Sequence, residues 1–330
     1  MLPGDPAQMM MGQNEDSEQL AKVKAKYGFD KPILTQYGYY INDLLPISFH
    51  SKNKEDYTFL SENKYSAAPL FSIGNTIAVL KFPYLRESFT KQGKKVTQVL
   101  GETLPNTFVL AVSAIVIAMI LGVLLGIVSA LYKDRWLDKS IQIFSTLGMS
   151  VPSFFSAILF AWFFGYILHE YTNLEMTGSL YELDDFGEDI HIKWKNLILP
   201  AIVLGIRPLA VVIQLMRNSL LEVFNQDYIR TARAKGLSEF QIIKRHAVKN
   251  ALNPVVTAIS GWFASMLAGA VFVEFIFGWN GLGKEIVNSL NTLDLPVIMG
   301  SVLVIATLFV MINILVDLIY VWLDPKVKLQ

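Results

Sequence analysis

The chain has 330 residues, of which 53% are hydrophobic and 17% are charged, and its formal net charge is zero. Soluble domains carry about 25% charged residues, so this deficit favours a protein buried in a membrane. A neutral chain gives no reason to expect nucleic-acid binding, and the lack of cysteine excludes disulfides and thiolate metal sites.

The segment 1–101 is polar and comes before any long apolar run. Residues 19–27 favour a short exposed helix, whereas residues 47–93 are rich in Ser, Asn, Lys and Tyr and show no helical period. We expect the latter to form a small extracytoplasmic cap that is rich in β-structure or irregular. Residues 96–100 are expected to lead into the first membrane span.

Five stretches are long and apolar enough to cross a bilayer. A hydrocarbon core about 30 Å thick needs roughly 20 apolar residues of helix, because no water is present to bond to exposed backbone groups. The five stretches are residues 104–132, 141–168, 197–223, 254–277 and 296–323. The predicted fold is therefore an all-α, polytopic membrane helix bundle over residues 102–330.

Lys and Arg residues in the short connections indicate the orientation of the spans. Residues 224–253, called the basic loop below, carry six of them, whereas residues 169–196 carry two against seven acidic residues. Alternating spans then place the basic loop in the cytoplasm and residues 1–101 outside it. Either a first span is missing from this sequence or this polar segment is exported without one, and we expect the missing span.

The basic loop favours two short helices that meet at a turn. Residues 227–235 favour helix, Gly236 suits a left-handed C-terminal cap, and Ser238 with Gln241 forms a capping box for a second helix. Pro254 then falls in the first turn of the next span, where a missing N–H costs nothing.

Small residues distinguish the first of these helices. Ala232 and Ala234 give it a low surface beside Gly236, which a groove of another protein can approach closely. Positive charge flanks this surface at Arg230, Arg233 and Lys235. On charge alone, an ordinary solvated loop on the cytoplasmic side is the simpler interpretation.

The stretch RTARAKG at 230–236 resembles the Ala-Gly loop of binding-protein-dependent ABC importer permeases, in the B-type branch that carries oligopeptides, dipeptides and nickel. The general family pattern opens with Glu-Ala-Ala, and here Arg230, Thr231 and Ala232 hold those places, a replacement common in the peptide branch. Further matches are LPGDP (2–6), LGETLPNT (100–107), FIFGWNGLG (275–283) and LVDLIYVWLDP (315–325). They leave about residues 47–84 as an insertion with no assigned function.

The resemblance implies that the short helix docks into a cleft on an ATPase and transmits its movement. By position, the docking residues are Thr231, Ala232, Arg233, Ala234, Lys235 and Gly236. The implied function is a channel-forming subunit of an ATP-driven importer in the bacterial cytoplasmic (inner) membrane, for oligopeptides or dipeptides ahead of nickel, glycosides or murein fragments. The implied partners are a second homologous permease subunit, two cytoplasmic ATPase subunits, an extracytoplasmic solute-binding protein and membrane lipid.

Polar residues inside the span 197–223 are candidates for the transport pathway, because such groups are costly in a membrane and often functional. Arg207 lies in mid-span beside Pro208, and two interpretations stand for it. It contacts the backbone carbonyl or carboxylate of a passing peptide, or it pairs with Glu274 or with carbonyls freed by the proline. A polar stripe toward the cytoplasmic end is expected to line the pathway as well: Gln214, Arg217 and Asn218.

No catalytic, cofactor or metal site is predicted. GWNGLGK (278–284) matches the start of a P-loop, but Glu285 replaces the hydroxyl residue that holds Mg²⁺, so its glycines are expected to form a tight turn. The four histidines lack metal-ligand spacing. The chain is then no enzyme by itself. An ion-coupled secondary transporter is the alternative function, for which Glu274 and Asp317 are candidate carboxylates. Gly122 and Gly126 favour close helix packing.

Overall fold

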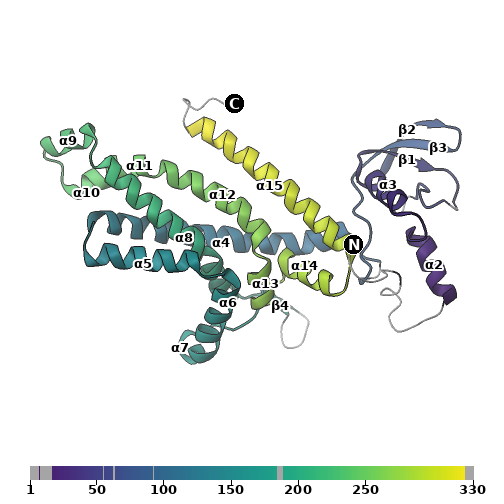
Figure 1. The fold of residues 1–330 in the computed structure, drawn as a ribbon, viewed down its shortest axis with the longest axis horizontal. Helices are drawn as coiled ribbons and strands as arrows, with labels where there is room; N and C mark the ends of the chain where they lie inside the picture. Colours follow the sequence, from purple (N-terminus) through teal and green to yellow (C-terminus); the bar gives the residue numbers. More distant parts are fainter. Residues whose placement is uncertain are drawn as a thin grey trace. The chain divides into compact units, whose positions relative to one another are not determined.

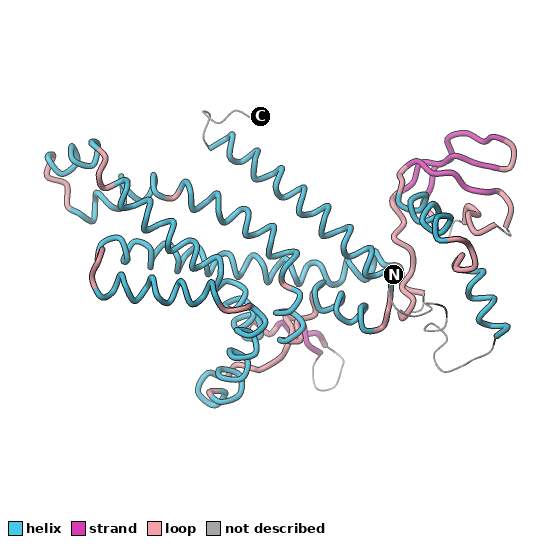
Figure 2. Tube along the Cα trace, in the orientation of Figure 1, coloured by secondary structure: helices cyan, strands magenta, loops and turns pink. Residues whose placement is uncertain are grey.

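The computed structural model describes residues 7, 17–54, 56–61, 64–91, 93–183 and 189–323, so the motif at 2–6 and the acidic residues 184, 185 and 188 lie outside it. The chain divides into two compact units, one formed by Met1–Glu102 with Ile286–Leu303 and the other by Thr103–Glu285 with Val304–Gln330. Among the described residues, the strands lie between 47 and 81 and between 181 and 192, and helix prevails elsewhere (Figure 2).

Among its described residues from 17 to 95, the first unit forms two helices and a three-stranded sheet. The helices are α2 (Ser17–Tyr27) and α3 (Ile33–Leu44), and the antiparallel strands lie in the order β1-β3-β2: β1 (Ile47–Ser51), β3 (Thr76–Lys81) and β2 (Ala67–Ile73). Helix α2 and the β-structure confirm the predictions for these segments, whereas α3 was not predicted. The buried Asp43 at the end of α3 accepts hydrogen bonds from Tyr65 Oη at 2.8 Å and Arg86 Nε at 2.9 Å.

A second buried carboxylate in this unit, that of Asp294, caps a helix. Asp294 precedes α15 (Leu295–Leu323) and accepts the Val297 N–H at 3.5 Å. The same carboxylate accepts Thr90 Oγ1 at 2.8 Å and the Phe89 N–H at 3.2 Å, so it holds residues 88–90 against the start of α15. Residues 278–295, expected as a break between spans, include the helix α14 (Leu282–Asn291). The break between spans is confirmed, and α14 is a short helix within it that was not predicted.

Among the described residues, three helices are long and apolar enough to cross a membrane, or up to five spans if each of two bent pairs counts as one. The three are α4 (Val96–Leu131), α8 (Lys195–Val223) and the segment Leu295–Val316 of α15. These confirm the predicted spans 104–132, 197–223 and 296–323. Helix α4 begins at Val96, where the lead-in to the first span was expected.

The predicted span 141–168 is not one straight helix. It consists of α5 (Trp136–Ser150) and α6 (Ser153–Trp162), followed by a π-helical turn at Phe163–Ile167, and the two parts are bent by 108°. The residue before a proline avoids the helical region, and Val151 is extended before Pro152. The predicted span 254–277 is likewise divided into α12 (Asn253–Gly269) and α13 (Val271–Phe277), bent by 59°.

Short elements connect these helices. The segment after the π-helical turn contains α7 (His169–Thr172) and the two-stranded pair β4 (Tyr181–Leu183) and β5 (Ile190–Ile192). The basic loop contains α9 (Asp227–Ala234), α10 (Glu239–Ile242), a π-helical turn (Ile243–Ala247) and α11 (Val248–Ala251).

Helix α8 lies at the centre of the second unit, where it packs against α5, α6 and α12 (Figure 1). Its most apolar window is 61% buried, against 28% for that of α4. Helix α4 approaches α8 at Gly122 and Gly126, where added Cβ atoms would meet Val212 and Met216. The predicted Gly-x-x-x-Gly packing face is confirmed.

We expect Gly126→Ala to lower the melting temperature of the purified protein. The new Cβ would lie 2.6 Å from Met216 Cβ and 3.0 Å from the Ile213 carbonyl oxygen, so α4 and α8 would have to separate. Overpacking of this kind costs about 1–3 kcal/mol. Gly101→Ala on the same helix is the matched control, because no atom lies within 4 Å of its added Cβ. Equal melting temperatures for the two variants in detergent would contradict the packing.

Candidate functional site

The basic loop has the two-helix form expected from its capping residues. Helix α9 ends before Gly236, whose φ of +77° is left-handed, a conformation that glycine adopts without strain. Ser238 then opens the second helix with a capping box. The Gln241 N–H donates to Ser238 Oγ at 3.4 Å and the Ser238 N–H donates to Gln241 Oε1 at 3.1 Å. Pro254 lies in the first turn of α12, as predicted.

The predicted docking residues do not all face outward. Five of them are exposed: Thr231, Arg233, Ala234, Lys235 and Gly236. Ala232 is only 5% exposed and, with Ile229 three residues earlier, lies on the inner face of α9. The small outward surface that the sequence suggested for α9 is therefore formed by Ala234 beside Gly236, without Ala232.

The inner face of α9 belongs to an apolar cluster that joins the basic loop to the long helices. Ile229 and Ala232 pack in it with Ile242 of α10, and α8 and α12 supply further members. The buried residues of this cluster are Ala130, Val212, Met216, Leu220, Ile229, Ala232, Ile242, Ala247, Ala251, Val255 and Ile259. The basic loop is thus part of the packed helical unit, and α9 and α10 lie at one end of it (Figure 1).

The outer face of the basic loop carries positive charge. Arg233 Nε lies 3.0 Å from Glu239 Oε1 and Arg230 Nη1 lies 3.4 Å from Asp227 Oδ1, but all four side chains are exposed, and such pairs contribute little to stability. Lys235 and Arg245 make no ion pair with any residue in the described ranges. This face therefore offers cations and small residues to a partner.

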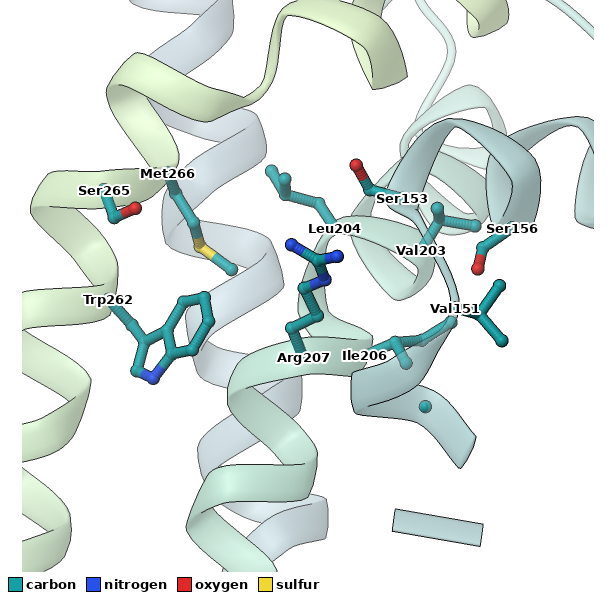
Figure 3. Close-up of a pocket in the computed structure, with 11 residues that line it drawn as sticks. Val151, Ser153, Ser156, Val203, Leu204, Ile206, Arg207, Trp262, Ser265 and Met266 are labelled. Carbon is teal, nitrogen blue, oxygen red and sulfur yellow. The ribbon is translucent and has the colours of Figure 1, made fainter. Parts of the chain in front are cut away.

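The four predicted pathway residues have different surroundings. Arg207 is exposed and lines a cavity of about 90 Å³ beside the break between α5 and α6 (Figure 3). Asn218 is also exposed, and Gln214 Nε2 lies 3.8 Å from Met149 Sδ.

Arg217 makes a two-pronged ion pair that the sequence did not suggest. Its Nε donates to Asp138 Oδ1 at 2.8 Å and its Nη2 donates to Asp138 Oδ2 at 2.7 Å. The Asp138 side chain is 3% exposed and also accepts the Ser129 hydroxyl and the Asp134 N–H. The pair joins α8 to the first turn of α5, so much of the Arg217 charge is already compensated within the chain.

Glu274 is not the partner of Arg207, so the suggested pairing of these two residues was wrong. Glu274 is fully buried, and its Oε2 accepts the N–H groups of Gly283 at 2.6 Å and Lys284 at 3.3 Å. An added Cβ at Gly281 would collide with the Glu274 carboxylate, which explains the glycine there. Residues 278–281 form a tight turn between α13 and α14, with Gly278 at a left-handed φ of +68°, as expected for these glycines.

That turn is fixed to α4 by further hydrogen bonds. Trp279 Nε1 donates to the Asn106 carbonyl oxygen at 3.0 Å, and Asn106 Nδ2 donates to the Asn280 carbonyl oxygen at 2.8 Å. Two motifs that are far apart in the sequence, at 100–107 and 275–283, therefore meet in space. The side chain of Asp317, the other candidate carboxylate, lies outside what the structure describes.

These features define a polytopic, helical membrane protein, and its fold has a counterpart among solved structures. An inward-facing structure of the MetNI methionine ABC transporter superposes with a TM-score of 0.55, covering 69% of this chain and 97% of that one at 14% identity. A second crystal form of the same transporter gives a TM-score of 0.53. At this identity, the likeness concerns the fold alone.

Residues 122–329 match the family described as "Binding-protein-dependent transport system inner membrane component", and residues 1–55 match its N-terminal companion model. The chain belongs to this family of inner-membrane transport permeases. It is 32% identical to the dipeptide transport system permease protein DppB of Alkalihalophilus pseudofirmus, over 99% of this chain and 91% of that protein. It is 31% identical to the D,D-dipeptide permease DdpB of Escherichia coli K12, over 99% of this chain and 89% of that protein.

Proposed function

We propose that this chain is a channel-forming subunit of an ATP-driven, binding-protein-dependent importer of oligopeptides or dipeptides. The observation that carries the proposal is the outer face of α9, where Ala234 and Gly236 lie exposed on a loop packed into the helical unit. The names of the two relatives, both dipeptide permeases, support the substrate class.

In this proposal the basic loop is the contact with an ATPase subunit. Thr231, Arg233, Ala234, Lys235 and Gly236 would enter a cleft on that subunit, while Ala232 holds α9 to its own chain. The uncompensated charges of Lys235 and Arg245 favour an acidic rim around the cleft. Two ATPase subunits that close on ATP would push two such loops.

The remaining partners follow from exposed apolar surface and from the need for a closed pathway. Ile120, Leu121 and Leu124 of α4 are exposed, and such side chains require lipid or another membrane subunit beside them. A second homologous permease subunit would complete the pathway, with Arg207, Gln214 and Asn218 among its lining residues and Arg217 near its cytoplasmic end. An extracytoplasmic solute-binding protein would deliver the peptide.

The proposal is tested by extracting the chain gently from its native membrane and identifying the proteins that purify with it. We expect an ATPase and a second permease in stoichiometric amounts. After reconstitution into liposomes, uptake of labelled alanyl-alanine should require ATP on the side of the basic loop and the binding protein on the other. A chain that purifies alone and takes up solute along an ion gradient, without ATP, would instead identify a secondary transporter.

A further inference from the structure

The break between α5 and α6 opens a small cavity in front of an arginine. Arg207 projects into it from α8, Ser153 and Ser156 line it from the first turns of α6, and Trp262 and Ser265 line it from α12 (Figure 3). Three helices that are separated in the sequence therefore meet at this cavity. It lies within the second unit, beside a helix break inside a predicted span.

The polar groups of this cavity lack partners within the chain. Arg207 makes no ion pair or side-chain hydrogen bond with any described residue, and the hydroxyls of Ser153, Ser156 and Ser265 make none either. Ser156 is only 8% exposed. Ser145 and Ser150 on α5 behave differently, because their hydroxyls donate to carbonyl oxygens one turn earlier. The Arg207 guanidinium is exposed on a membrane-spanning helix, and a charged group there is costly unless a ligand, water or a partner subunit binds it.

The cavity is positively charged. Arg207 is the one charged residue among the described residues that line it. The carboxylates of Asp138 and Glu274 are engaged elsewhere, since Asp138 pairs with Arg217 and Glu274 accepts N–H groups at the start of α14. The first turn of α6 has no side-chain cap, so its N–H groups add a partial positive charge at the same place.

The volume of the cavity limits what can bind. Sites that enclose a whole small-molecule ligand measure about 300–1,000 Å³, whereas this cavity measures about 90 Å³. It accommodates one small anionic group with a few water molecules and leaves the remainder of a solute outside. A guanidinium forms two parallel hydrogen bonds with a carboxylate, which is the anionic group that every unmodified peptide carries at its C-terminus.

We propose that this cavity binds the C-terminal carboxylate of the transported peptide, an inference that rests on the proposed function. Arg207 would pair with both carboxylate oxygens, and Ser153 and Ser156 would donate hydrogen bonds to them. Side chains of the peptide stay outside the cavity, so the permease selects for a free carboxylate and not for peptide sequence.

The absence of cysteine from the chain allows a direct test in the assembled transporter. The single-cysteine variant Ser153→Cys is treated with an anionic and a cationic methanethiosulfonate reagent, with and without a non-hydrolysable ATP analogue. We expect the anionic reagent to react faster, after correction for its rate with a free thiol. Adding Arg207→Gln should lower the ratio of the two rates by about tenfold, because a nearby charge has opposite effects on the two reagents.

Two controls separate this inference from the proposed function. Ser17→Cys, at an exposed position on α2, should show a rate ratio that Arg207→Gln leaves unchanged. Alanyl-alanine should protect Ser153→Cys from labelling at concentrations where alanyl-alanine amide does not. The anion site is overturned if Ser153→Cys is not labelled in either nucleotide state. It is also overturned if Arg207→Gln leaves the ratio of the anionic to the cationic labelling rate unchanged. Equal protection by the acid and the amide overturns its peptide ligand, whereas failure of ATP-driven uptake with the rate ratio intact overturns only the proposed function.

Discussion

Ala234→Trp should abolish ATP-driven uptake while the chain still folds and inserts into the membrane. Ala234 is exposed on the outer face of α9, so the larger side chain would extend into the space of a docked ATPase. We expect uptake to fall by at least about 30-fold, the effect of losing an interface contact worth about 2 kcal/mol. The measurement is peptide uptake by proteoliposomes, with ATP hydrolysis recorded in parallel.

Two further tryptophan variants give this experiment its controls. Ala25→Trp, at an exposed helical position on α2, should leave uptake unchanged. Ala232→Trp differs, because Ala232 is buried in the apolar cluster under α9, so this variant should lose thermal stability as well as uptake. Undiminished uptake by Ala234→Trp would count decisively against the outer face of α9 as the docking surface.

Asp138→Ala should destabilise the protein by about 3–5 kcal/mol, the usual cost of removing one partner of a buried ion pair. The Arg217 guanidinium, with its side chain 19% exposed, would lose both of its hydrogen bonds to a carboxylate. The Ser129 hydroxyl and the Asp134 N–H would lose their acceptor too. Thermal unfolding in detergent measures the loss.

An exposed ion pair in the same protein provides the comparison. Asp227→Ala removes the partner of Arg230, where both side chains are mostly solvated, so a change of at most about 1 kcal/mol is expected. The double variant Asp138→Asn with Arg217→Gln should be more stable than the sum of the single changes predicts, because the two side chains interact directly. Strict additivity would show that the pair contributes nothing of its own.

Local patterns in the sequence were sufficient for much of the helical structure. A long apolar run forms a helix whether lipid or protein surrounds it. The predicted ranges therefore lie within a few residues of the bounds of α8 and α15. Gly236, Ser238 and Gln241 predicted the turn of the basic loop, because cap geometry depends on neighbouring residues alone.

Other features depend on contacts that no local pattern contains. Hydropathy depends on the composition of a segment and not on the direction of the helix axis, so it does not predict the bend at Pro152. The proline itself was a signal in the sequence for such a bend. The pairing of Asp138 with Arg217 joins positions 79 residues apart. Ala232 is buried only because Ile242 and α8 come to lie beside it, so its inward orientation could not be read from the loop alone.

The apolar cluster under α9 has a mechanical consequence. Interiors packed at this density compress very little, and Ile229 and Ala232 are held in one cluster with Leu220 of α8 and Val255 of α12. A displacement of α9 is therefore not taken up by a flexible connection. It moves the adjoining ends of α8 and α12 together, so that α9 and the two long helices move as one rigid group.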